Sequence, residues 1–111
     1  MNTKQIQDLL LLQIDNTWKR TNAHGVNLEK SLVPPQRITI FEQTVSNGKV
    51  IEKPVDVWLL LKEEPSHDIG YRIVAKPDGN MFGLVHEDLN AEPKWFFCGW
   101  YKDFMTAFKE M

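Results

Sequence analysis

Residues 37–62 read RITIFEQTVSNGKVIEKPVDVWLLLK, and this stretch decides the fold. Both of its halves are rich in β-branched residues, and between them stands Ser46-Asn47-Gly48, whose residues tolerate the positive φ angles of a tight turn. The stretch therefore predicts a hairpin with strands at 37–45 and 49–62. Pro54 has no N–H to give to a ladder, so we expect a bulge or a sheet edge at that residue.

Three further strands are expected after the hairpin, at 71–76, 81–86 and 94–101. A tight turn at Pro77-Asp78-Gly79-Asn80 joins the first two, and polar segments at 63–68 and 87–93 make the other connections. Successive strands joined in this way form an antiparallel meander.

A helix is predicted on each side of the strands. Residues 2–20 contain no Pro or Gly, can begin with Asn2 or Thr3 as N-cap, and carry an apolar stripe at four-residue spacing: Ile6, Leu10, Ile14 and Trp18. Residues 21–36 are expected to form a loop with one helical turn at 28–32. Near the C-terminus, Asp103 is a good N-cap for a short amphipathic helix that carries Phe104, Ala107, Phe108 and Met111.

These elements predict one α+β domain over residues 1–111, with an antiparallel meander sheet of about five strands and both helices packed on it. The length of 111 residues, with 42% hydrophobic and 25% charged residues, is typical of one globular domain.

The overall charge argues against nucleic acid as a partner. The formal net charge is −2, and Lys and Arg are scattered, so a basic surface that displaces counterions is not expected. The single cysteine, Cys98, and an N-terminus without a secretory signal pattern predict a cytoplasmic protein. The apolar runs 9–12 and 57–61 are too short to span a bilayer, so we expect no membrane association.

Two of the predicted strands are apolar on both faces. In the second strand Val57 and Leu59 alternate with Trp58 and Leu60, and the fifth strand, around 95–100, has large apolar groups on both sides. Two short helices cover one face, so the face of Trp58 and Leu60 needs a different cover: the 21–36 loop, a second subunit or a ligand. We expect a homodimer, and Leu9 and Leu12, which lie outside the helix stripe, favour it as well.

No catalytic or metal-binding pattern is found. His24, His67 and His86 lack the spacing of metal ligands, and in His86-Glu87-Asp88 adjacent strand residues point to opposite faces. Cys98 has aromatic neighbours, which favours a buried structural thiol over a nucleophile. The acidic pairs 63–64 and 87–88 lie in polar turns, and no phosphate-binding glycine loop is present. We therefore expect no metal, no cofactor and no enzymatic activity.

If a ligand binds, the mixed face of the second strand is the best position for it. An apolar and aromatic pocket needs a few polar groups that fix orientation, and the residues that meet this description are Asp56, Trp58, Leu60, Tyr71, Arg72 and His86. The alternative for Trp58 is a place in a dimer interface, where aromatic residues are enriched.

The C-terminal stretch contains Met81-Phe82-Gly83-Leu84-Val85, then Cys98-Gly99-Trp100-Tyr101-Lys102-Asp103-Phe104, then Ala107-Phe108. This pattern, FGL, then GWY, then F-x-x-A-F, resembles the ending of small uncharacterised bacterial proteins, some of which travel on mobile gene cassettes. The resemblance covers about the last thirty residues and implies an accessory gene product and an architecture, because packing residues make up the motif.

Together these observations predict a small accessory binding protein that is homodimeric and holds a protein or a small apolar ligand in a sheet-face cleft. Two alternatives stay open: an immunity-like or antitoxin-like protein that binds a bacterial toxin, favoured by size and mild acidity, and a small enzyme with an unrecognised site.

Overall fold

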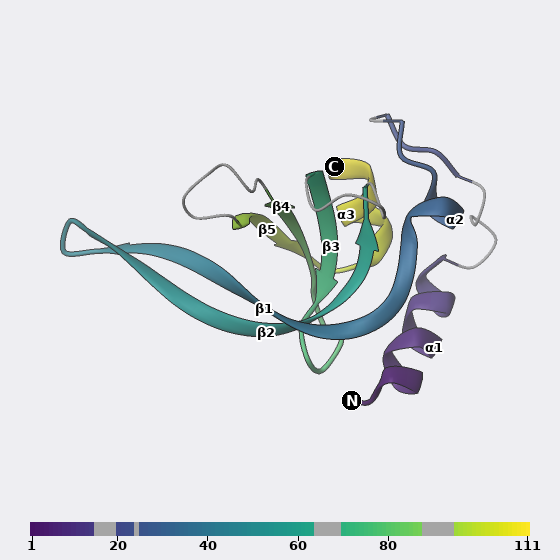
Figure 1. Ribbon diagram of the computed structural model, residues 1–111, viewed down its shortest axis with the longest axis horizontal. Helices are drawn as coiled ribbons and strands as arrows, with labels where there is room; N and C mark the ends of the chain where they lie inside the picture. Colours follow the sequence, from purple (N-terminus) through teal and green to yellow (C-terminus); the bar gives the residue numbers. More distant parts are fainter. Residues whose placement is uncertain (15–19, 24, 64–69, 88–94) are drawn as a thin grey trace.

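The sheet is a five-stranded antiparallel meander in the order β1-β2-β3-β4-β5, as predicted. The computed structural model describes residues 1–14, 20–23, 25–63, 70–87 and 95–111, without the side chains of 43, 44, 87 and 95–98. The strands are β1 (Leu32–Ser46), β2 (Lys49–Lys62), β3 (Gly70–Ala75), β4 (Phe82–Glu87) and β5 (Trp95–Tyr101). The helices are α1 (Thr3–Ile14), α2 (Leu28–Ser31) and α3 (Phe104–Glu110). Figure 1 shows their arrangement.

The hairpin turn is the predicted one. Asn47 and Gly48 have φ angles of 51° and 76°, the pair of positive values that a type I′ turn requires. At its other end β1 begins at Leu32, so the prediction of a loop up to residue 36 is wrong for the last five residues. The pairing with β2 is irregular between Leu32 and Gln36, and an edge strand such as β1 tolerates the intervening Pro34-Pro35.

Pro54 lies at a sheet edge, one of the two expected alternatives. It pairs with Phe41 without a break in register, and β3 begins to pair with β2 only at Trp58, so the other side of Pro54 faces no strand among the described residues. The irregularity in β2 occurs instead between Leu59 and Leu61, opposite β3.

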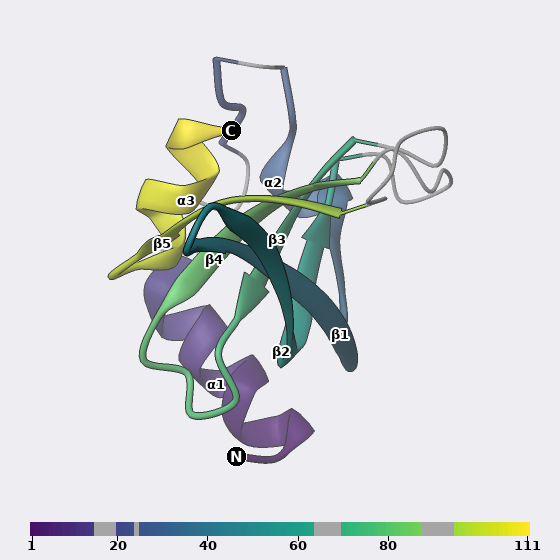
Figure 2. The same ribbon diagram turned by 90° about the vertical axis from the view of Figure 1, so that its left-hand side faces the viewer.

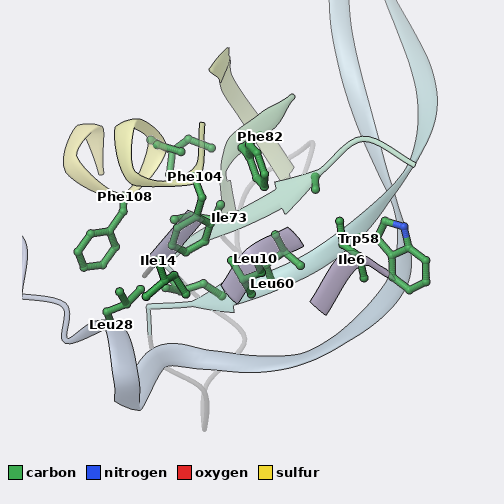
Figure 3. Close-up of a cluster of buried hydrophobic side chains, with 14 of the residues drawn as sticks. Ile6, Leu10, Ile14, Leu28, Trp58, Leu60, Ile73, Phe82, Phe104 and Phe108 are labelled. Carbon is green, nitrogen blue, oxygen red and sulfur yellow. The ribbon is translucent and has the colours of Figure 1, made fainter. Parts of the chain in front are cut away.

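The helices α1 and α3, together with Val26 and Leu28 of the 21–36 segment, cover the face of the sheet that carries Trp58 and Leu60. This corrects the expectation that the two helices leave this face open, and it confirms in part the alternative that the 21–36 segment covers it. Figures 1 and 2 show α1 and α3 together on one side of the sheet. The buried residues of this helix-side core, many of which Figure 3 shows, include Ile6, Leu10 and Ile14 of α1, Leu28 of α2, Trp58, Leu60, Ile73 and Phe82 of the sheet, and Phe104, Ala107 and Phe108 of α3.

The opposite face is closed by the curvature of the sheet. A second buried cluster lies there, and all of its described members are strand residues: Ile40, Val57, Leu59, Val74 and Val85. The first and last strands, β1 and β5, approach each other across this face without a backbone ladder between the described strands. Because the strands are strongly twisted and coiled, β1 and β5 come close together and the sheet encloses a small apolar core on this face.

The N-terminal helix begins with Asn2 as its cap, one of the two alternatives predicted from the sequence. The Asn2 side chain accepts a hydrogen bond from the Gln5 N–H (2.9 Å), and the Gln5 side chain accepts one from the Asn2 N–H (2.8 Å), which is a reciprocal capping box. Residues 15–19, which include Trp18, lie outside the described residues. Among the described residues, no helix is long and apolar enough to cross a membrane.

Asp103 caps α3, also as predicted. Its carboxylate accepts hydrogen bonds from the Thr106 hydroxyl and the Thr106 N–H, both at 2.7 Å, and these bonds lower the pKa of Asp103 from its ordinary value of 3.8. A lowered pKa in the folded state adds stability at pH values above the unfolded pKa, and this stability is lost as the pH falls through the folded pKa.

We expect Asp103→Ala to cost about 1 kcal/mol of the free energy of unfolding at neutral pH, because the cap is lost. Asp103→Asn is the matched control, since it keeps an oxygen acceptor that does not titrate. Urea unfolding at several pH values measures both variants. The difference in the free energy of unfolding between wild type and Asp103→Asn should become smaller as the pH falls below about 4. A difference in this free energy that does not depend on pH would contradict the role of the carboxylate.

Candidate interaction surface on the β1–β2 arm

The hairpin extends well beyond the sheet that supports it. β2 has 14 residues and β3 has six, and β3 pairs with β2 only between Trp58 and Lys62. The residues 37–58, from the Arg37–Trp58 pair outward, therefore form a two-stranded projection, called the arm below. Figure 1 shows the arm pointing away from the helices, and it accounts for the elongated shape, with extents of 46 × 29 × 21 Å.

One face of the arm is exposed at every described side chain from the 39/56 pair to the turn. Cross-strand partners point to the same face, and the pairs 39/56, 41/54, 43/52 and 45/50 continue the face that carries Trp58. The described side chains of this arm face are all exposed: Thr39, Phe41, Val45, Val50, Glu52, Pro54 and Asp56. Val45 is 75% exposed, Val50 64% and Phe41 37%.

The other face of the arm is supported near its base. There Ile40 and Val57 are buried in the second core, and Val55 packs against it. Among the described side chains on that side, Ile51, close to the turn, is the one large apolar residue that is exposed (47%). A two-stranded hairpin is only marginally stable alone in water, so an arm with one face wholly in solvent is an unusual place for three large apolar side chains.

The arm has no formal net charge. Its charged residues are three cations and three anions: Arg37, Lys49, Lys53, Glu42, Glu52 and Asp56. On the arm face, the Thr39 hydroxyl donates to the Asp56 carboxylate at 2.8 Å, which ties the two strands together. A surface of this kind suits a partner that supplies apolar contacts and a few hydrogen bonds, and it does not select a strongly charged one.

Trp58 marks the boundary between the arm face and the helix-covered core. Its side chain is 5% exposed, and the Arg37 guanidinium carbon lies 5.1 Å from the centre of its ring. The buried Nε1–H has no hydrogen-bond acceptor among the described residues. In Figure 3, Trp58 lies beside Ile6 at one end of the buried cluster.

The six ligand-binding residues predicted from sequence fall into two separate groups. Asp56, Trp58 and Leu60 lie near the arm base, where Asp56 is exposed and Leu60 is fully buried in the helix-side core. Tyr71, Arg72 and His86 lie toward the other end of the sheet, because Arg72 is level with Lys62, four residues along β2 from Trp58.

Within the second group, the Tyr71 and His86 rings meet edge to face with centroids 4.9 Å apart. The Tyr71 N–H donates to the Glu63 carboxylate at 2.9 Å. Arg72, 8% exposed, alternates with Tyr71 along β3 and so points to the opposite face of the sheet. The register therefore brings Tyr71 and His86 together, but it does not gather the six residues around one cleft.

The residues weighed for metal or thiol chemistry fall largely outside the described part of the chain. His24, His67 and Asp88 lie there, as does the side chain of Cys98. Among the described residues, no group of three or more His, Cys, Asp or Glu side chains is placed to hold a metal ion.

The sequence reasoning missed the residues of the arm face, above all Phe41, Val45 and Val50. It treated both hairpin strands as parts of a covered sheet. The signal that reveals the arm is a mismatch of lengths: a predicted strand of 14 residues stands next to one of six, and a neighbour that short leaves more than half of the longer strand without a ladder on that side.

Comparison of the chain with protein family models, with curated proteins and with solved structures finds no match. The resemblance of the C-terminal stretch to small bacterial accessory proteins stays an expectation, and the residues of the chain itself carry the proposals that follow.

Proposed function

We propose that this protein is a small binding protein without catalytic activity, which contacts a protein partner through the arm face. The observation that carries the proposal is the solvent exposure of Phe41, Val45 and Val50 on an arm that nothing else among the described residues covers on that side. Apolar side chains gathered on a projecting element are typical of a protein-binding surface.

The kind of recognition follows from the shape of the surface. The arm face is a narrow strip two strands wide, with Glu52 between the apolar pairs 45/50 and 41/54, and with the polar pair Thr39 and Asp56 between 41/54 and Trp58. A projecting ribbon enters a groove of a partner more readily than it encloses a small molecule, which needs a concave pocket. A protein partner is therefore favoured over a small apolar ligand. An immunity-like or antitoxin-like role is one form of this proposal, and a homodimer presents two such arms.

The test is affinity capture from the source organism with matched variants. Val45→Lys with Val50→Glu replaces an exposed apolar cross-strand pair by an oppositely charged pair, which keeps the ribbon paired while it removes the apolar surface. The control is Ile51→Thr, which changes an exposed apolar residue close to the same turn but on the other face.

We expect wild type and Ile51→Thr to retain the same stoichiometric polypeptide, and the Val45→Lys/Val50→Glu variant to retain at most about a tenth as much, the loss typical of a truncated hot spot. Equal retention by all three proteins would overturn the use of the arm face. Stabilisation of wild type by a small apolar compound, with no polypeptide retained, would favour the small-molecule alternative instead.

A further inference from the structure

The arm is held against the far edge of the sheet by side chains. The first and last strands, β1 and β5, approach each other but form no ladder in the described part of the chain. Between them, the Trp100 Nε1–H of β5 donates a hydrogen bond of 2.7 Å to the Glu42 carboxylate of β1. Figure 2, viewed from the end of the molecule that carries the arm, shows the β1–β2 hairpin together with β4 and β5.

The Trp100 ring is fixed by its neighbours as well as by this hydrogen bond. Gly83 of β4 pairs directly with Trp100, and a Cβ atom on Gly83 would stand only 2.7 Å from Trp100 Cζ3, so the ring occupies the space that the glycine leaves free. The Lys76 ammonium lies 4.9 Å from the ring centroid and adds a cation–π contact. The group Glu42, Lys76, Gly83 and Trp100 is called the seam below.

The seam lies where support for the arm matters most. Glu42 is the second residue outward along β1 from Ile40, which is fully buried, and beyond the Glu42–Lys53 pair every described side chain of the arm is exposed. A hydrogen bond from a neutral donor to a carboxylate is stronger than one between two neutral groups, and an isolated two-stranded ribbon has little stability of its own. The hydrogen bond between Trp100 and Glu42 therefore contributes strongly to the direction in which the arm points.

We propose that Trp100 is a positioning residue for the arm, and that the seam sets the orientation in which the arm face is presented. The seam lies on the opposite side of the ribbon from Phe41, Val45 and Val50, so it controls the arm face without touching a partner bound there. The consequence for partner binding rests on the proposed function, while the tie itself is a property of the protein alone.

Hydrogen exchange of the backbone amides, measured on the purified protein without any partner, tests the tie. Trp100→Phe keeps an aromatic ring in this position but removes the Nε1 donor together with part of the indole that covers Gly83, whereas Glu42→Leu removes the acceptor from the other side and leaves the indole intact. Each variant should speed exchange of amides in residues 38–57 about five- to tenfold and leave those of β3 and β4 unchanged, because an arm freed from the seam opens locally while the sheet does not. Lys49→Gln, an exposed change near the turn of the arm in a residue that pairs with Ser46 and not with Glu42, is the control and should leave exchange unchanged.

The double variant shows whether the two substitutions remove one shared hydrogen bond or destabilise the arm in two independent ways. If Trp100 and Glu42 act through one hydrogen bond, Trp100→Phe combined with Glu42→Leu should speed exchange no more than either change alone. Additive effects, or arm exchange equal to wild type in Trp100→Phe, would overturn the proposal. Failure of the capture experiment would leave these exchange results standing, so the two proposals fail separately.

Discussion

Phe104→Ala is expected to cost about 3–5 kcal/mol of the free energy of unfolding, which is a large part of the total stability of a domain of this size. Phe104 is fully buried at the centre of the helix-side core. Its ring meets Phe82 of β4 edge to face at 6.1 Å and stacks with Phe108 at 6.4 Å, so it joins α3 to the sheet. Truncation leaves a cavity where the helix and the sheet are in contact.

Urea unfolding followed by circular dichroism measures this loss. The matched control is Lys109→Ala on the same helix, where the side chain is exposed and a change within about 0.5 kcal/mol is expected. If Phe104→Ala unfolds at nearly the wild-type urea concentration, α3 does not pack on the sheet in solution as the structure describes.

Trp58→Ala is expected to destabilise the protein by about 3–5 kcal/mol as well, while Trp58→Phe should cost no more than about 1 kcal/mol. The ring is packed beside Ile6 in the helix-side core, so its removal leaves a cavity. Phenylalanine restores most of the ring and also removes the buried Nε1–H, which has no acceptor among the described residues and so carries an unrecovered desolvation cost.

Thermal unfolding and light scattering of the two variants separate the possible roles of Trp58. A strongly destabilised Trp58→Ala with a stable Trp58→Phe is the result expected of a core residue. A stable Trp58→Ala that has lost its dimer would place Trp58 in a subunit interface instead. A stable variant that has lost only the stabilisation by an apolar compound would assign it to a ligand pocket.

The prediction of the fold succeeded where local chemistry is decisive. Asn47-Gly48 adopts the turn that its tolerance of positive φ allows, and Asn2 and Asp103 cap the helices that they were predicted to begin. The strand order also follows from local sequence, because strands that are joined by short polar connections lie next to each other in the sheet.

The candidate site was much less predictable. Alternation along β2 separates Trp58 and Leu60 from Val57 and Leu59 correctly, but it does not say which set the helices cover. The assignment chosen from the sequence was the reverse of the observed one. Both sets are apolar and of similar size, so the choice depends on the direction in which the sheet curls, and that direction results from all strands together.

By itself, the sequence determined the turn, the helix caps and the order of the strands, because each depends on the backbone preferences and hydrogen bonds of a few neighbouring residues. Only the tertiary structure decided the rest. Trp100 and Glu42 are 58 residues apart, and they meet because the sheet curls until β5 reaches β1. Phe41, Val45 and Val50 are exposed because β3 is too short to support β2 along its length, so the surface proposed here for binding follows from the packing of the whole sheet.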